Sequence, residues 1–212
     1  MFAIQNLKHA YDGTEVLNVP AWQVEQGSQW LVLGPSGSGK TTLLHVLAGI
    51  LRPAAGGVSV AGQDLGALKA NALDRFRGRH IGIVLQRLHL MESLNVLDNL
   101  LLAQYLARLP RDRERVAKVL AGLDLADKAG AYPHELSFGQ AQRVAVARAV
   151  VNHPKLLLAD EPTSNLDDGR CLQALELLQG QARACNATLL IATHDQRVKS
   201  RMPNQFTLGS RP

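Results

Sequence analysis

The chain has 212 residues, which is enough for one α/β domain with a buried core and a single inserted subdomain. Its 23 lysines and arginines against 18 acidic residues give a net charge of +5, and only 4% of the residues are aromatic. So few aromatic side chains disfavour a surface that binds RNA by base stacking, and we expect no nucleic-acid partner.

We expect no signal peptide and no membrane-spanning segment. The chain begins Met1-Phe2-Ala3-Ile4 without a basic region and a long apolar run, and no stretch approaches 18 uninterrupted apolar residues. The basic residues are scattered except for two alternating groups, Arg75, Arg77 and Arg79, and Arg111, Arg113 and Arg115. We interpret these groups as solvated surface, with nucleic acid or an acidic membrane surface as the alternative.

Short strands are predicted at the start of the chain. Three segments have strand-like patterns: Phe2–Leu7, Glu15–Val19 and Gln29–Leu33. Turn signals at Asp12-Gly13 and Gln26-Gly27 separate these segments. A further short strand is expected at Val58–Val60, between glycines on both sides.

Residues 34–41 read Gly-Pro-Ser-Gly-Ser-Gly-Lys-Thr, which matches the phosphate-loop pattern G-x-x-x-x-G-K-[ST] between a strand and a helix. The glycines at 34, 37 and 39 let the backbone curl so that successive N–H groups face one anion, at the positive end of the helix. Lys40 can reach the outer phosphates of a nucleotide, and the Thr41 hydroxyl can bind Mg²⁺. The predicted nucleotide contacts are Gly34, Pro35, Ser36, Gly37, Ser38, Gly39, Lys40, Thr41 and Thr42.

The rest of the chain predicts a parallel sheet with a helical insert. A helix is expected over residues 64–79, and a buried strand over 81–85 ends at Gln86, whose amide oxygen could complete a Mg²⁺ site. A lone glutamine is otherwise a surface residue. Helical spacing dominates from about 92 to 152, and strands return at 155–160 and 188–192, with a helix between them over about 168–184.

Acidic and histidine side chains lie at the carboxyl ends of the last two predicted strands. Asp160 could hold Mg²⁺ and Glu161 could orient and deprotonate a water molecule, because ligands bind at the carboxyl edge of a parallel sheet. Alternatively, both acids cap a following helix. His194 could hydrogen-bond a terminal phosphate, and Tyr11 could stack on adenine, although each residue type also occurs in purely structural roles.

A Ser-x-Gly turn precedes another predicted helix, at Leu136-Ser137-Phe138-Gly139-Gln140. The N-terminus of a helix that begins with such a turn is a second anion site. The alternative is a plain helix cap, in which Ser137 and Gln140 form a capping box.

In combination, these segments resemble the nucleotide-binding subunit of an ATP-binding-cassette (ABC) transporter: Gly34–Thr41, Gln86, Leu136–Gln140, Leu156–Glu161, Ser164–Asp167 and His194. The resemblance extends from about Phe2 to Leu208. It implies an α/β fold with a P-loop NTPase (RecA-like) core, an N-terminal antiparallel β subdomain and an inserted α-helical subdomain. Residues 1–212 would form a single ABC ATPase domain, with 1–86 and 154–212 as the nucleotide-binding core and 87–153 as the helical subdomain.

The resemblance also implies a mechanism. Family members form head-to-tail dimers with a second copy and bind ATP and Mg²⁺ between the phosphate loop of one subunit and the Ser137–Gln140 segment of the other. By analogy, the catalytic residues are Lys40, Glu161 and His194, the Mg²⁺ ligands are Thr41, Gln86 and Asp160, and further nucleotide contacts come from Tyr11, Ser137, Gly139, Gln140 and Asp167. The helical subdomain would receive a short helix of an integral membrane subunit, which would place the chain at the cytoplasmic face of the inner (plasma) membrane.

Two details refine the resemblance. Phe138 stands where the family usually has the first glycine of Leu-Ser-Gly-Gly-Gln, so its backbone conformation must tolerate a Cβ atom. Residues 158–167, Asn165 above all, resemble the subgroup of lipoprotein-releasing, macrolide-exporting and cell-division ATPases. This favours extraction or export of a hydrophobic, lipidated or peptide substrate. The alternatives are a switch that controls a periplasmic or cell-wall hydrolase, and a soluble ABC ATPase that acts on nucleic acid or ribosomes.

Overall fold

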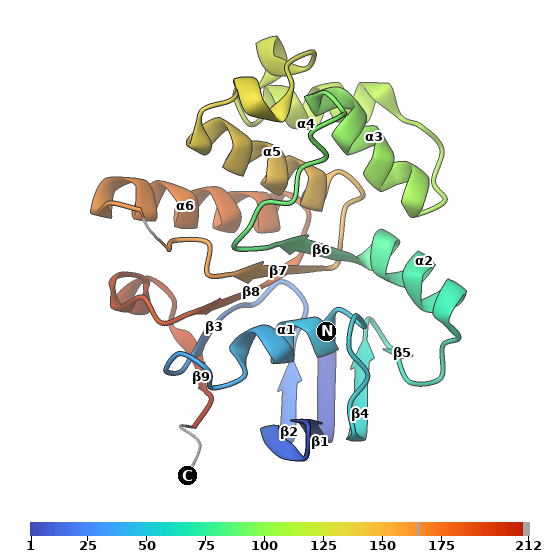
Figure 1. Cartoon of the computed structure of the whole chain (residues 1–212), viewed down its shortest axis with the longest axis vertical. Helices are drawn as coiled ribbons and strands as arrows, with labels where there is room; N and C mark the ends of the chain where they lie inside the picture. The colour runs from blue at the N-terminus through green and yellow to red at the C-terminus, as the bar shows by residue number, and fades with distance from the viewer. Residues whose placement is uncertain (165, 210–212) are drawn as a thin grey trace.

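The computed structural model describes residues 1–164 and 166–209, so Asn165 lies outside the described residues. Two sheets form the framework (Figure 1). The antiparallel sheet has the order β2-β1-β4-β5, from β1 (Phe2–Tyr11), β2 (Thr14–Val24), β4 (Ala55–Val60) and β5 (Gln63–Asp64). The parallel sheet has the order β6-β7-β8-β3-β9, from β3 (Gln29–Leu33), β6 (Ile81–Val84), β7 (Leu156–Asp160), β8 (Thr188–Thr193) and β9 (Asn204–Thr207).

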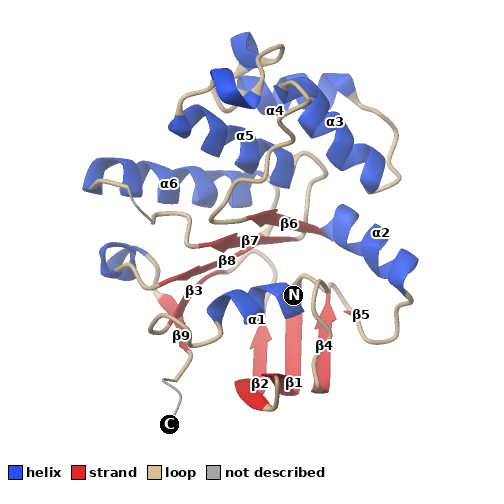
Figure 2. Ribbon diagram, in the orientation of Figure 1, coloured by secondary structure: helices blue, strands red, loops and turns tan. Residues whose placement is uncertain are grey.

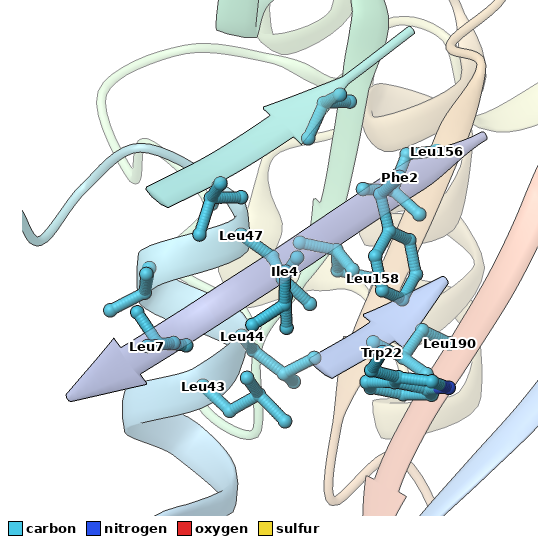
Figure 3. Close-up of a cluster of buried hydrophobic side chains, with 14 of the residues drawn as sticks. Phe2, Ile4, Leu7, Trp22, Leu43, Leu44, Leu47, Leu156, Leu158 and Leu190 are labelled. Atoms are coloured by element: carbon cyan, nitrogen blue, oxygen red, sulfur yellow. The ribbon is translucent and has the colours of Figure 1, made fainter. Parts of the chain in front are cut away.

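Helix α1 (Lys40–Leu47) lies between the two sheets (Figure 1). The buried apolar residues of α1 pack in one cluster with side chains of both sheets, which Figure 3 shows around Ile4, Leu44 and Leu158. Trp22 of β2 also stacks on Phe206 of β9, with ring centroids 4.1 Å apart. The start of α1, where the phosphate loop ends, is therefore supported from both sides by close-packed apolar side chains.

The central parallel strands are apolar on both faces, as expected for strands covered on both sides. In β7, Leu156 and Leu158 face the cluster around α1, whereas Leu157 and Ala159 face a second cluster. This second cluster contains side chains of α5 (Phe138–Val150) and α6 (Asp168–Ala184), which cover the other face of the sheet. The period-2 alternation thus explains why all five residues of β7 are buried.

The segment between β6 and β7 is helical (Figure 2). It contains α3 (Val96–Leu106), α4 (Arg113–Ala121), α5 and two 3-10 turns, η1 (Ala126–Lys128) and η2 (Pro133–Glu135). Side chains of α3, α4 and α5 form a third apolar cluster of their own. Side-chain oxygens cap each of these α-helices at the residue before its first turn: Asn95, Asp112 and Ser137. The predicted fold class, with its antiparallel sheet, parallel core and helical insert, is confirmed.

Several predicted boundaries were wrong. The helix expected from residue 64 begins at α2 (Ala70–His80), because Gly62 has a φ of +80° and turns the chain from β4 into β5. The helical stretch from 92 to 152 is interrupted at residues 107–112, where Pro110 cannot donate a backbone hydrogen bond. Strand β9 and the 3-10 helix η3 (Gln196–Arg201) were not predicted.

We expect the Leu158→Ala variant to lose about 2–5 kcal/mol of unfolding free energy, because Leu158 is fully buried in the apolar cluster formed by α1 and both sheets. Urea denaturation followed by circular dichroism measures this loss. Leu106→Ala is the matched control, since Leu106 is 63% exposed and its truncation should cost less than about 0.5 kcal/mol. Equal stability of the two variants would contradict the packing described above.

Candidate nucleotide-binding site

The phosphate loop occupies residues 34–39, between β3 and α1. Gly37 and Gly39 have φ angles of +78° and +93°, which only glycine adopts without strain. A Cβ atom on Gly39 would also lie 2.7 Å from the Val16 carbonyl oxygen. Gly34 differs from these two glycines, since its φ is not positive. A glycine is needed at position 34 for steric reasons, because a Cβ atom there would lie 2.4 Å from Ser38 Oγ and 3.0 Å from the Leu208 carbonyl oxygen.

The Lys40 side chain is held under this loop and is only 6% exposed. Its Nζ donates hydrogen bonds to the carbonyl oxygens of Gly34, at 2.8 Å, and Pro35, at 3.0 Å. The same ammonium lies 3.8 Å from Oε1 of Glu161. The positive charge is therefore fixed at the phosphate loop, where it can contact the outer phosphates of a nucleotide.

Asp160 and Thr41 meet at the base of the site. Thr41 Oγ1 donates a hydrogen bond to Oδ2 of Asp160 at 2.8 Å, whereas the buried Oδ1 has no donor among the described residues. Burial raises the pKa of Asp160, although the Thr41 hydrogen bond opposes this effect. A buried carboxylate oxygen without a donor, next to a hydroxyl, fits a Mg²⁺ ligand set. Gln86 lines a cavity together with Thr41, and its Nε2 lies 3.5 Å from Ser164 Oγ.

Glu161 is fixed by the neighbouring strand. It follows β7 with a φ of +47°, a sparsely populated conformation for a residue with a side chain, and its N–H donates to the Ala192 carbonyl at 2.8 Å. One carboxylate oxygen accepts from Thr193 Oγ1 and the other contacts His194 Nδ1, both at 2.8 Å. The helix-cap alternative for Asp160 and Glu161 is wrong, because α6 begins at residue 168 with Asp167 as its cap.

These side chains surround a cavity of about 350 Å³. Its lining combines residues from β1, β2, the phosphate loop, α1 and the ends of β6, β7 and β8: Tyr11, Val16, Ser36, Gly37, Gly39, Lys40, Thr41, Thr42, Gln86, Glu161 and His194. Tyr11 is 47% exposed at the rim, where its ring is accessible for stacking. A carboxylate, an imidazole and an ammonium converge at one end of this cavity, a combination suited to phosphoryl transfer to water.

The Ser137–Gln140 segment lies elsewhere. Ser137 and Gln140 form the capping box of α5, with Ser137 N donating to Gln140 Oε1 and Gln140 N donating to Ser137 Oγ. Together with Gly139 they line a separate cavity of about 580 Å³ that shares no residue with the phosphate-loop cavity. Asp167 caps α6 through Arg170 N at 2.9 Å and lines neither cavity. Within one chain, none of these four residues therefore lines the cavity that contains Lys40.

Phe138 is the first residue of α5, and helical backbone accommodates its Cβ atom. Its ring is 56% exposed. We expect the Phe138→Gly variant to keep the fold, with a loss of at most about 1 kcal/mol from glycine in the first helical turn, and to change ATP turnover only modestly. Thermal unfolding and phosphate release measure the two effects. A large destabilisation would mean that Phe138 is a packing residue.

Sequence reasoning missed several residues that support the site. Asp195 follows His194, and its carboxylate accepts hydrogen bonds from Thr163 Oγ1 and from the guanidinium of Arg197. The Arg197 hydrogen bonds lower the pKa of Asp195 well below its usual range. Thr193, which holds Glu161, was also missed. The acidic residue after His194 was the one available signal for this group.

The fold and the site together define a phosphate-loop ATP-hydrolysing domain. The family model described as "ABC transporter" matches residues 17–164. The chain therefore belongs to the ABC transporter family, as its ATPase domain, and the family resemblance seen in the sequence is confirmed.

Named relatives and a solved structure support this family assignment. The chain is 38% identical to the lipoprotein-releasing system ATP-binding protein LolD of Paramagnetospirillum magneticum, over 94% of this chain and 91% of the relative. It is 39% identical to the macrolide export ATP-binding/permease protein MacB of Rhodopseudomonas palustris, over 84% of this chain and 27% of the relative. A dimeric post-hydrolysis structure of the cassette MJ0796 bound to ADP and Pi superposes with a TM-score of 0.87 at 29% identity, covering 98% and 94% of the two chains.

The described part of the chain contains no helix that combines the length and the apolar character needed to cross a membrane.

Proposed function

We propose that the chain is the ATP-hydrolysing subunit of a bacterial transporter that closes around two ATP molecules as a head-to-tail dimer. One observation carries this proposal: Lys40, Glu161 and His194 line one cavity, whereas Ser137, Gly139 and Gln140 line another. A second copy could supply the Ser137–Gln140 segment to the phosphate-loop cavity. The dimeric cassette structure and its 0.87 TM-score support this arrangement.

In this proposal, the phosphate loop and Lys40 bind the phosphates, and Tyr11 stacks on adenine. Glu161 accepts a proton from the water whose oxygen attacks the γ-phosphorus, while the bond to ADP breaks. His194 contacts the γ-phosphate and remains oriented by Glu161. Thr41, Gln86 and Asp160 would hold Mg²⁺, which neutralises phosphate charge when bound.

The partner-facing contacts complete the site. Ser137, Gly139 and Gln140 of one copy would approach the γ-phosphate bound by the other copy, at the N-terminus of α5. Asp167 would reach across the same interface from the start of α6. Because these contacts form only with the γ-phosphate present, ATP would favour the closed dimer and hydrolysis would release it.

We further propose that residues 1–212 form one ATPase domain, with 1–86 and 154–212 as its core and 87–153 as a helical subdomain. A groove of about 620 Å³ lies between α2, β6 and α3, with Ile83, Leu102 and Leu106 among its apolar lining. An amphipathic helix of an integral membrane subunit fits such a groove, and would hold the chain at the cytoplasmic face of the inner membrane. The names of these relatives, a lipoprotein-releasing system and a macrolide exporter, favour extraction or export of a lipidated or hydrophobic substrate.

A pull-down from native membranes tests the proposed transport function. Tagged Glu161→Gln chain is incubated with ATP or, as the control, with ADP, and captured proteins are identified by mass spectrometry. We expect ATP-enriched capture of a membrane protein with few spans and a large extracytoplasmic domain. Capture of a periplasmic hydrolase regulator would favour the switch alternative, and capture of ribosomal or other soluble proteins alone would contradict transport.

A further inference from the structure

The loops that follow β7 and β8 are joined by side chains around Asp195. Thr163, two residues after Glu161, donates from Oγ1 to Asp195 Oδ2 at 2.9 Å. Asp195 directly follows His194, and its own N–H donates to Thr193 Oγ1, which in turn donates to Glu161. The two loops that carry Glu161 and His194 are therefore connected by an unbroken series of hydrogen bonds.

Arg197 extends this series of hydrogen bonds away from the phosphate-loop cavity. Its Nε and Nη2 bind both carboxylate oxygens of Asp195 at 2.7–3.1 Å. Its Nη1 donates to the Leu166 carbonyl at 2.9 Å and to Asp168 Oδ1 at 2.8 Å. Only a guanidinium offers donors in this forked geometry, so a lysine at the same position could not satisfy all three acceptor groups.

The groups that Arg197 binds lie in two parts of the molecule, the loop that carries His194 and the segment around Asp167. Arg197 and His194 border the same cavity of about 330 Å³, which shares Gln86, Glu161 and His194 with the phosphate-loop cavity. Leu166, in contrast, lines the cavity beside Ser137, and Leu166 and Asp168 flank Asp167. One side chain therefore fixes both the loop beside the phosphate loop and the segment next to the Ser137–Gln140 face.

We propose that Arg197 is a positioning residue that couples the His194 loop to the segment around Asp167, so that contact of His194 with the γ-phosphate is transmitted to the surface that meets the second copy. This role rests on the proposed head-to-tail dimer. Arg197 touches neither the nucleotide cavity near Lys40 nor the phosphate loop. Its loss should therefore weaken dimer closure without weakening nucleotide binding by a single chain.

The test uses the full chain with Glu161→Gln, which is expected to hold ATP in a stable dimer. Adding Arg197→Ala should raise the dimer dissociation constant with ATP about tenfold, equivalent to about 1.4 kcal/mol, as measured by analytical ultracentrifugation. ADP affinity of the monomer should stay within about twofold, since single-chain contacts are unchanged. Arg197→Lys, which keeps the charge, should restore dimerisation only in part. In the chain that keeps Glu161 and can hydrolyse ATP, Arg197→Ala should also lower the Hill coefficient for ATP hydrolysis.

Two further variants keep the outcome decisive. Arg201→Ala removes an exposed arginine of the same 3-10 helix and should leave the dimer unchanged. Asp168→Asn keeps the Asp195–Arg197 pair and weakens one outer contact, because the amide oxygen can still accept the Arg197 hydrogen bond but carries no negative charge. It should weaken the dimer, though less than Arg197→Ala, and it tests the coupling if Arg197→Ala unfolds. Unchanged dimerisation in both the Arg197→Ala and Asp168→Asn variants would overturn the coupling role alone. A Glu161→Gln chain that remains monomeric with ATP would contradict the dimer itself, and the coupling role with it.

Discussion

The Glu161→Gln variant should lose ATP hydrolysis by about a thousandfold while it still binds ATP. Glutamine has the same shape as glutamate, and its amide oxygen can still accept the hydrogen bond from Thr193. It cannot accept a proton from the attacking water. The substitution also removes a negative charge 3.8 Å from Lys40 Nζ. The ammonium should then attract the phosphates of ATP more strongly. The expected product is a long-lived ATP-bound dimer.

Phosphate release and sedimentation with ATP measure the two parts of this result. Glu176→Gln is the matched control, because Glu176 is an exposed residue of α6 outside both cavities around the phosphate loop. It should hydrolyse ATP at the rate of the unaltered chain. If the Glu161→Gln variant also does so, Glu161 is not the proton acceptor, and His194 becomes the residue to test.

The Lys40→Ala variant should lose nucleotide binding, with ATP affinity reduced about a hundredfold or more. Lys40 is the buried cation of the phosphate-loop cavity, so its charge is screened less than that of a surface lysine. Titration with a fluorescent ATP analogue measures the loss. Lys8→Ala, which removes an exposed lysine of β1, should bind the analogue normally.

The same substitution leaves the carbonyls of Gly34 and Pro35 without their donor. Thermal unfolding without nucleotide therefore has to accompany the titration. Weak binding by a variant that unfolds normally supports direct contact between Lys40 and phosphate. Unchanged ATP affinity would remove Lys40 from the proposed binding site.

The parts of the fold that the sequence predicted well have strong local patterns. The strand predicted at 155–160 is a continuous apolar run, and the helix predicted at about 168–184 has helical spacing. The structure has both at nearly these bounds. Strand β9 has no such pattern. Its four residues are half-buried or exposed, and they form a strand because they pair with β3, some 170 residues earlier in the chain.

Some residues of the candidate site could likewise be predicted from the sequence, and others could not. The phosphate loop could be located because a short motif specifies its backbone. Asp160, Glu161 and His194 could be located because Asp160 ends a buried strand and the other two directly follow one. The reason for Gly34 could not be read from the motif, since it depends on Ser38 and on the Leu208 carbonyl from the far end of the chain. Arg197 was missed because its partners come from separate loops, whose proximity is a property of the folded chain. The roles of all these residues remain predictions.

The position of α1 between two sheets means that amide hydrogen exchange should detect ATP far from the phosphates. Nucleotide at the N-terminus of α1 stabilises a helix whose apolar side chains pack on both sheets. At 100 times its dissociation constant, bound ATP should raise the free energy of any opening that releases it by about 2.7 kcal/mol. Amides of β1 and β4 that exchange through such openings should slow as much as those of β7 and β8. The antiparallel sheet would then report nucleotide occupancy, although only Tyr11 and Val16 of its strands line the cavity.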